Sequence, residues 1–407
     1  MAEQHGKTLV PEIRFSGFTD PWEQRKLGEL FEESDERASD REILSVSVAN
    51  GIYPASESDR ETNPGASLAN YKIVHFGDVV YNSMRMWQGA VDASRYDGIV
   101  SPAYVVARPN SEVYARFFAR LLRQPMLLKQ YQQVSQGNSK DTQVLKFDDF
   151  ASIGISMPAS ENEQCQIGAF FDRLDSLITL HQRKYDKLCV LKKSMLDKMF
   201  PKGGSLYPEI RFSGFTDPWE QRKLGEVARR VTRKNENGDS DLPLTISAQY
   251  GLVDQRTFFN SQVASKDMSG YFLLHRGEFA YNKSTSADSP WGAIKRLEKY
   301  DMGCVSTLYI CFELLSGDPD FLVTYYETDR WYKAVQLIAA EGARNHGLLN
   351  IAPDDFFETQ ICIPKRIDEQ CRIGAVFNRL DSLITLHQRK LELLRNIKKS
   401  MLDKMFV

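Results

Sequence analysis

The feature that most constrains the fold of this chain is an internal repeat. Three blocks occur twice: PEIRFSGFTDPWEQRKLGE at 11–29 and 208–226, RLDSLITLHQRK at 173–184 and 379–390, and KKSMLDKMF at 192–200 and 398–406. Self-similarity of this kind indicates two copies of one structural unit. The first block is shifted by 197 residues and the others by 206, so the second copy is nine residues longer in the middle.

Between the repeated blocks the two halves have diverged. Runs rich in β-branched and aromatic residues, separated by Gly, Pro and Asn, predict strands, and a helical stretch follows in each half. The strands are expected at 43–49, 71–76, 102–108 and 155–157 and at 242–248, 271–275, 304–313 and 361–363, with helices within 113–134 and 321–340. Each half is therefore predicted to be a mixed α/β domain.

After each domain, apolar residues recur three and four positions apart. They are Ile167, Phe170, Leu174, Leu177, Leu188, Leu191 and Met195, and then Ile373, Val376, Leu380, Leu383, Leu394, Ile397 and Met401. This spacing is typical of a coiled-coil seam. Two such helices in one chain most simply pack on each other antiparallel. His181 and His387 lie on the seam at equivalent places, where a metal ligand or pH switch is disfavoured because no further ligands stand at suitable spacing.

These patterns predict six segments. They are an N-terminal tail at 1–10, a first α/β domain at 11–160, a first long helix at 161–200, a linker at 201–207, a second α/β domain at 208–366 and a second long helix at 367–407. The linker PKGGSLY contains the helix breakers that would end the first long helix.

Composition narrows the class of protein. No apolar run approaches the ~20 residues that span a bilayer, and the N-terminus lacks the apolar core of a signal peptide, so a cytoplasmic protein is expected. The six Cys residues form no CxxC pair and are expected to be reduced thiols. A net charge of −2 argues against indiscriminate coating of nucleic acid, but it permits binding through local basic faces.

The motifs of the commonest nucleotide-dependent and DNA-modifying enzymes are missing. The sequence has no Walker-type phosphate loop and no GxGxxG turn. No lysine has Asp or Glu two residues before it, as a metal-dependent nuclease of the common type would need. The chain is therefore expected to carry neither a catalytic nor a metal site of its own.

A binding signal is present in the variable middles. Arg116, Arg120 and Arg123 have helical spacing, so they share one face that could hold phosphates or could simply be solvated. A loop of amide and basic side chains follows at 136–143, and EGARNHG at 341–347 takes its place in the second half. A second variable pair is NSMRMWQGA at 82–90 and NKSTSADSPWGA at 282–293. Asn, Gln, Lys and Arg are the side chains that read base edges.

Taken in order, the repeated 11–29 block, the segment 81–106 and the helix EQCQIGAFFDRLDSLITLHQRK with its second copy are similar to the specificity subunits of type I restriction–modification systems. The resemblance covers residues 11–407, although 282–312 keeps only the outline of its first-half counterpart. It implies two target-recognition domains, each reading one half of a bipartite double-stranded DNA site. It also implies that the helices dock two modification subunits, which methylate adenine N6 with S-adenosylmethionine.

Under this resemblance the chain is a non-catalytic bacterial DNA-recognition subunit. Restriction subunits, which use ATP and Mg²⁺, can join the complex, and all cofactors belong to the partners. The candidate DNA-binding residues are Arg85, Gln88, Arg116, Arg120, Arg123, Asn138, Ser139, Lys140, Lys283, Trp291, Arg344, Asn345 and His346. The candidate partner-docking residues are Leu174, Leu177, His181, Leu188, Leu191, Leu380, Leu383, His387 and Leu394. The alternative is a coiled-coil adaptor whose α/β domains bind proteins instead of DNA.

Overall fold

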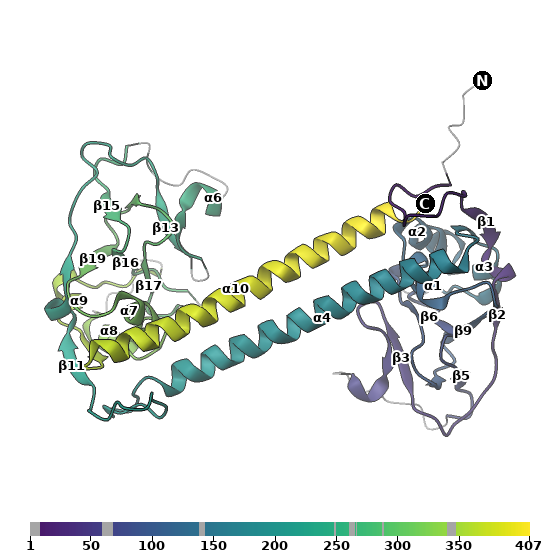
Figure 1. The fold of residues 1–407 in the computed structure, drawn as a ribbon, viewed down its shortest axis with the longest axis horizontal. Helices are drawn as coiled ribbons and strands as arrows, with labels where there is room; N and C mark the ends of the chain where they lie inside the picture. The colour runs from purple at the N-terminus through teal and green to yellow at the C-terminus, as the bar shows by residue number, and fades with distance from the viewer. Residues whose placement is uncertain are drawn as a thin grey trace. The chain divides into compact units, whose positions relative to one another are not determined.

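The computed structural model describes residues 9–58, 68–137, 143–247, 250–259, 265, 267–286, 289–339 and 347–407. The chain forms two compact units, which we call the first unit (Met1–Gln182 and Arg389–Val407) and the second unit (Arg183–Gln388). Each unit holds one α/β domain and one end of each long helix, α4 (Glu161–Lys198) and α10 (Ile367–Lys404) (Figure 1). The compact units therefore differ from the predicted segments, because each unit takes part of both long helices.

The domain of the first unit is built from short antiparallel pairings. A four-stranded sheet has the order β2 (Phe31–Glu33), β9 (Tyr104–Pro109), β6 (Val79–Asn82), β7 (Val91–Ala93). Three two-stranded sheets join β1 (Glu23–Lys26) to β10 (Gly154–Met157), β3 (Leu44–Ser47) to β4 (Gly51–Pro54), and β5 (Lys72–Val74) to β8 (Gly98–Val100). The helices α1 (Ala115–Leu121), α2 (Pro125–Val134) and α3 (Phe147–Ala151) complete the domain.

The second unit repeats this topology. Its four-stranded sheet has the order β12 (Ala228–Arg230), β19 (Ile310–Leu314), β16 (Phe279–Asn282), β17 (Ala293–Arg296). The pairs are β11 (Glu220–Lys223) with β20 (Gln360–Ile363), β13 (Leu244–Ser247) with β14 (Gly251–Asp254), and β15 (Phe272–His275) with β18 (Met302–Val305). Its helices are α5 (Leu224–Val227), α6 (Gln255–Phe259), α7 (Pro319–Tyr325), α8 (Tyr332–Ile338) and α9 (Pro353–Phe357).

Within each unit the two long helices run antiparallel. In the first unit Lys398 Nζ lies 2.5 Å from Asp175 Oδ1, and Arg395 donates to Gln182 at 3.0 Å, so moving back along α10 means moving forward along α4. In the second unit Lys192 Nζ lies 2.6 Å from Asp381 Oδ1. The predicted mixed α/β fold, with two domains on long antiparallel helices and an internal duplication, is confirmed.

The predicted seam is wrong in part. Leu177, Leu191 and Leu383 are 36%, 47% and 37% exposed, whereas Phe171 and Phe377, which the seam omitted, are fully buried. The reason is that the packed stripe must also meet the α/β domain, so it is displaced by one residue at the end nearest the domain. The exposed leucines are left on the outer surface of the helices.

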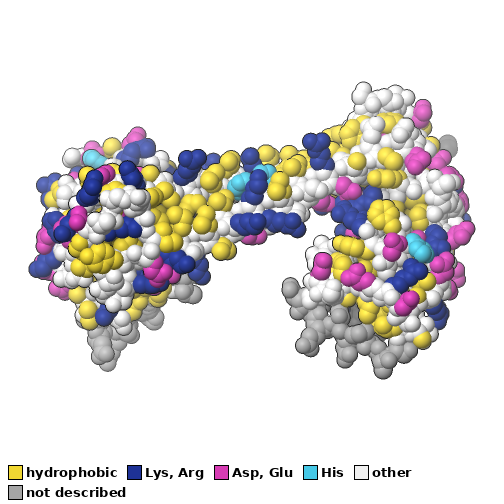
Figure 2. Space-filling model, turned by 60° about the horizontal axis from the view of Figure 1, so that its bottom comes forward, with side chains coloured by type: hydrophobic (Ala, Val, Ile, Leu, Met, Phe, Trp, Pro, Cys, Tyr) yellow, Lys and Arg dark blue, Asp and Glu magenta, His cyan; other side chains and the backbone are white. Residues whose placement is uncertain are grey.

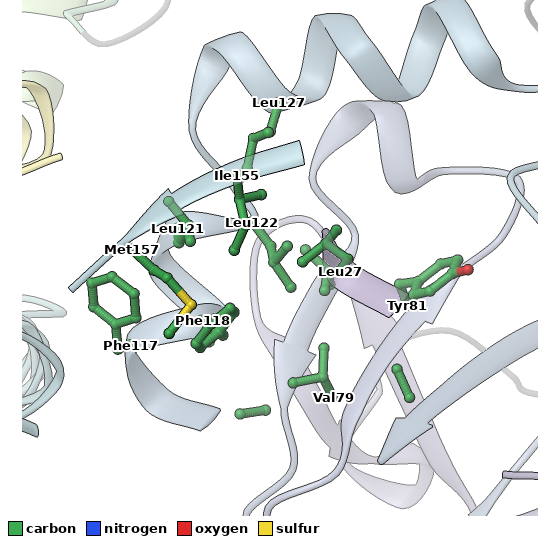
Figure 3. Close-up of a cluster of buried hydrophobic side chains, with 14 of the residues drawn as sticks. Leu27, Val79, Tyr81, Phe117, Phe118, Leu121, Leu122, Leu127, Ile155 and Met157 are labelled. Carbon is green, nitrogen blue, oxygen red and sulfur yellow. The ribbon is translucent and has the colours of Figure 1, made fainter. Parts of the chain in front are cut away.

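Each core is completed by a phenylalanine at the equivalent position of the repeated KKSMLDKMF block. In the first unit, part of whose core is shown in Figure 3, Phe406 stacks on Phe117 with ring centroids 5.5 Å apart and lies 6.1 Å from Trp22. In the second unit Phe200 stacks on Phe321 at 5.7 Å. The C-terminal end of the chain therefore completes the core that its N-terminal domain begins.

A buried acid fixes each domain to the helix that follows it. Glu163 is 1% exposed, and its carboxylate accepts hydrogen bonds from Arg14 Nε and Nη2 at 2.6 and 2.7 Å. Trp22 Nε1 donates to the same carboxylate at 3.5 Å. Glu369 receives the equivalent bonds from Arg211 and Trp219. We call these contacts the first and second lock. Their donors all come from the identical 11–29 and 208–226 blocks.

Candidate nucleic-acid interface

One pair of variable segments, 82–90 and 282–293, begins at the same structural turn in both units. β6 ends at Asn82 and β16 at Asn282, and each asparagine Oδ1 accepts a hydrogen bond from the amide two residues later, at 3.0 Å. Such asparagine side chains bond their own backbone two residues on and so favour a turn of the chain. One buried strand end therefore carries a different loop in each unit.

In the first unit this loop presents polar and apolar side chains to solvent. Met84 is 46% exposed, and the exposed Arg85 donates to Gln88 at 3.1 Å. The loop closes at Gly89, whose φ of +91° is one that L side chains rarely adopt, and Met86 anchors it in the core. Arg85 and Gln88, both predicted DNA contacts, are thus held together on one rigid turn.

The chain that directly follows the second variable segment pairs with the asparagine-turn loop in each unit. Leu145 N donates to Ser83 O at 2.9 Å in the first unit, and Leu349 N donates to Lys283 O at 3.0 Å in the second. The predicted readers Asn138, Ser139, Lys140, Arg344, Asn345 and His346 lie outside the described residues. The chain on the C-terminal side of each of these two stretches is the part that pairs with the asparagine-turn loop.

In the second unit the predicted residues Lys283 and Trp291 are more enclosed. Lys283 Nζ donates to Ile351 O at 3.2 Å, and partial burial lowers the pKa of this ammonium group. Trp291 packs on the second core and accepts a hydrogen bond from Tyr281 Oη on its carbonyl at 2.8 Å. Both residues therefore shape the loop, and only the outer part of each side chain remains exposed.

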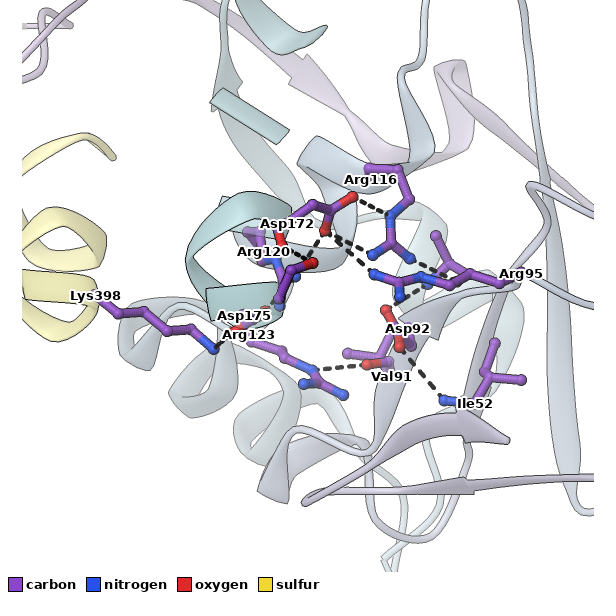
Figure 4. A network of polar contacts seen from close by, with 12 residues as sticks. Ile52, Val91, Asp92, Arg95, Arg116, Arg120, Arg123, Asp172, Asp175 and Lys398 are labelled. Atoms are coloured by element: carbon purple, nitrogen blue, oxygen red, sulfur yellow. Dashed lines mark hydrogen bonds and ion pairs between the residues drawn. The ribbon is translucent and has the colours of Figure 1, made fainter. Parts of the chain in front are cut away.

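The predicted phosphate-binding face of α1 is not arranged as expected. Arg116 binds Asp172 through Nε at 3.0 Å and Nη2 at 2.7 Å, and Arg120 Nη2 lies 2.7 Å from Asp175 Oδ2 (Figure 4). Arg123 donates to Val91 O at 2.7 Å. With only 14% and 11% of the Arg116 and Arg120 side chains exposed, these residues hold the domain to α4, and we do not include the three arginines in the proposed DNA surface.

The sequence patterns did not reveal the acceptors of these arginines or the donors of the locks. Asp172 and Asp175 stand three apart on α4, which is the spacing of one helix face. Read together with the arginines four apart on α1, they could have indicated a pair of complementary helix faces. For Glu163 the only signal is that Glu-Gln-Cys recurs at Glu369 with the same shift of 206 residues, and this does not show which donors surround the acid.

The predicted docking residues divide into buried and accessible sets. Leu174 and Leu380 are 7% exposed and belong to the cores, and Leu188 and Leu394 pack against them. His181 and His387 are half-buried. Leu177, Leu191 and Leu383 remain accessible, together with Leu180, Val190, Leu386 and Leu393. Among the described residues no group of three or more His, Cys, Asp or Glu side chains could hold a metal ion.

Residues 19–189 match the model of the type I restriction modification DNA specificity domain. The match covers most of the first copy of the internal repeat, so this part of the chain is similar to that domain family. A solved structure of the S subunit of a type I restriction–modification system from M. genitalium shares the fold of this chain, with 13% identity, a TM-score of 0.55 and coverage of 98% of this chain and 99% of that one.

A second solved structure, the HsdS subunit from Thermoanaerobacter tengcongensis, is 15% identical over 96% of this chain and 98% of its own, with a TM-score of 0.44. No match was found among the curated proteins. None of the described helices is long and apolar enough to cross a membrane.

Proposed function

We propose that this chain is a specificity subunit in which each α/β domain reads one half of a bipartite double-stranded DNA site. The observation that carries this proposal is the same in both units. A loop that differs between the halves follows the equivalent strand end in each unit, and the chain just after a second variable stretch is hydrogen-bonded to that loop. Two domains that recognise different base sequences need the same supporting fold and different loops on it.

The reading surface of the first unit is proposed to include Arg85 and Gln88 with the loop that holds Asn138, Ser139 and Lys140. Arg and Lys read guanine, and Asn and Gln read adenine, by paired hydrogen bonds in the major groove. In the second unit the loop that holds Arg344, Asn345 and His346 takes this role, supported by Lys283 and Trp291.

Methylation mapping tests this proposal. Arg85→Ala in the full chain, expressed with its modification subunits, should relax one half-site and leave the other unchanged, at a cost of about 1–3 kcal/mol for one base-reading side chain. Arg37→Ala, another exposed arginine of the first unit, serves as the control and should change neither half-site. Equal weakening on cognate and mismatched DNA would show that Arg85 only positions the backbone.

We further propose that the outer surface of the long helices docks two modification subunits. Figure 2 shows hydrophobic and basic side chains next to each other along these helices. Leu177 with Leu180, and Leu383 with Leu386, stand at equivalent places of the repeated block, so one partner surface could bind each of them. Leucines that are 36% to 46% exposed would be covered in such a complex.

The docking proposal is tested by reconstitution. Leu177→Glu and Leu180→Glu together should remove one modification subunit from the assembly, and adding Leu383→Glu with Leu386→Glu should remove both. Native mass spectrometry would count the subunits. An unchanged stoichiometry would place the docking surface elsewhere.

In this proposal the chain is not catalytic, S-adenosylmethionine, ATP and Mg²⁺ belong to partner subunits, and the protein acts in the bacterial cytoplasm where its DNA lies. The adaptor alternative predicts no DNA dependence. An electrophoretic shift of duplex DNA by the purified complex, but not by modification subunits alone, would exclude it.

A further inference from the structure

The paired long helices carry the same ion pair in both units. It consists of Asp175 and Lys398 in the first unit and of Asp381 and Lys192 in the second, with oxygen–nitrogen distances of 2.5 and 2.6 Å. The aspartates come from the repeated RLDSLITLHQRK block and the lysines from KKSMLDKMF. We call each of them the frame pair. It is constant although the α/β domains differ.

The helices that dock on the frame pair, α1 and α7, occupy equivalent places. Gln164 Oε1 accepts from Tyr114 N at 2.9 Å just before α1, and Gln370 Oε1 accepts from Asp318 N at 2.9 Å just before α7. Both helices are seven residues long. The same shift of 204 residues that relates Tyr114 to Asp318 relates Arg123, just beyond α1, to Glu327.

The two domains bind opposite members of the frame pair. In the first unit Arg120 Nη2 lies 2.7 Å from the aspartate, Asp175 Oδ2. In the second unit Glu327 Oε2 lies 2.7 Å from the lysine, Lys192 Nζ. Arg120, Glu327 and Lys192 are 11%, 21% and 17% exposed, so these contacts lie in surroundings where charge-assisted hydrogen bonds are strong.

The charges of the two units are also opposite on the strands β7 and β17. Asp92 pairs with Val80 in the sheet of the first unit, and Lys295 pairs with Ala280 at the same register in the second. Lys295 Nζ is 3.9 Å from Glu327. These equivalent positions therefore hold Asp92 and Arg123 in one unit and Lys295 and Glu327 in the other, which is a charge reversal at both. In the first unit the contact to the frame pair is made by Arg120, one turn before Arg123.

We propose that the frame pair is a docking socket that accepts recognition domains of either charge. Its carboxylate receives a domain that presents arginine, and its ammonium group receives a domain that presents glutamate. Because an Asp–Lys pair is neutral overall, it offers both signs without repelling either. This inference rests on the proposed function only in calling the α/β domains recognition domains, and it is tested without DNA.

Single neutralisations in the full chain test the socket. Asp175→Asn and Lys398→Met both break the frame pair of the first unit, but only Asp175→Asn also removes one of the two acceptors of Arg120. Lys192→Met and Asp381→Asn both break the frame pair of the second unit, where only Lys192→Met also removes the nearer of the two lysines that pair with Glu327. Comparing the two variants within a unit therefore cancels the loss of the helix–helix ion pair. Peptide-resolved hydrogen exchange of 115–123 and 319–327 reports how firmly each docking helix is held.

The expected sensitivities are opposite in the two units. Lys192→Met should speed exchange of 319–327 about 5- to 30-fold relative to Asp381→Asn, which is the range for loss of one such ion pair. In the first unit Asp175→Asn should speed exchange of 115–123 more than Lys398→Met does. The factor should be smaller than in the second unit, because Asp172 still holds Arg120 at 3.0 Å. If the same member dominated in both units, or the two variants of a unit behaved alike, the socket would be refuted.

A substitution in the α/β domain controls for the possibility that changes in the long helices destabilise the whole unit. Glu327→Gln leaves both long helices unchanged and should raise exchange of 319–327 as much as Lys192→Met does. The double variant should add little to either, since both remove the same ion pair. Additive effects would mean that Glu327 and Lys192 do not act through each other, which would also overturn the proposal.

Discussion

The first and second units are two solutions built on one frame, and they differ where the domain meets the helices. Both use a buried glutamate lock, a phenylalanine from KKSMLDKMF and an Asp–Lys frame pair. At the junction the first unit uses arginines on aspartates, whereas the second uses a glutamate on a lysine. The comparison teaches that hydrophobic and lock contacts set the placement, while the sign of the junction charge can change.

The largest expected effect is on the locks, where the units should behave alike. Glu163→Ala and Glu369→Ala each leave an arginine and a tryptophan without their acceptor, and breaking a buried pair costs about 3–5 kcal/mol. Denaturant unfolding followed by hydrogen exchange of each unit would measure this. A cost that differed strongly between the units would break the equivalence of the two frames.

The phenylalanine contacts should show which unit each helix end serves. Phe406→Ala should destabilise the first unit and Phe200→Ala the second, each by about 3 kcal/mol, since a large buried ring is removed. Exchange rates resolved along the chain would assign each loss. Destabilisation of the second unit by Phe406→Ala would contradict the observed packing.

The arginine junction separates a structural role from a DNA-binding role. Replacing Arg116 and Arg120 by Ala should destabilise the first unit by roughly 2 kcal/mol, because the charge-assisted hydrogen bonds to Asp172 and Asp175 are removed. The salt dependence of DNA binding by the complex should not change. A salt slope reduced by about 0.9 for each phosphate that is no longer neutralised would instead return these arginines to the DNA surface.

A close approach of helix and domain at Gly168 and at Gly374 sharpens the comparison further. A Cβ at Gly168 would lie 2.7 Å from a ring carbon of Tyr114, and one at Gly374 would lie 2.7 and 2.8 Å from Asp320 Cβ and Phe321 N. Alanine gains about 1 kcal/mol over glycine within a helix, but this crowding opposes the gain. We expect a net loss of about 1 kcal/mol for Gly374→Ala and less for Gly168→Ala, where a ring can move. Matched melting curves would compare them.

The smallest effect concerns alkaline pH. Burial by itself would lower the pKa of Lys192, but the charges and hydrogen bonds of Glu327 and Asp381 outweigh it and raise the pKa above its ordinary value. A group whose pKa is raised by folding stabilises the protein below its unfolded pKa, near about 10.4, and this contribution is lost as pH rises through the folded pKa. Above about pH 10 the second unit should therefore lose stability faster in the wild type than in Lys192→Met. Identical slopes for both proteins would contradict the shift.

Much of the fold could be predicted because its signals are local. Identical blocks fold alike, strand composition and helix periodicity act over a few residues, and so the duplication, the α/β domains and the antiparallel helices all follow from the printed letters. The loop that holds Arg85 was also recognised, because it stands beside a repeated strand end and differs between halves. These inferences need no knowledge of which distant residues meet.

Only the tertiary structure decided which partners the charged and apolar faces find. Arg116, Arg120 and Arg123 were expected to face phosphates, but α1 turns them onto α4 and β7, where Asp172, Asp175 and the Val91 carbonyl receive them. The seam was misplaced at Leu177 and Leu191 because a helix that meets both another helix and a domain buries a stripe that is displaced from a simple two-helix seam, as the burial of Phe171 shows. Most decisively, Phe406 at the end of the chain completes the core around Trp22 near its beginning, and these two residues are too distant in sequence for any local pattern to indicate that they meet.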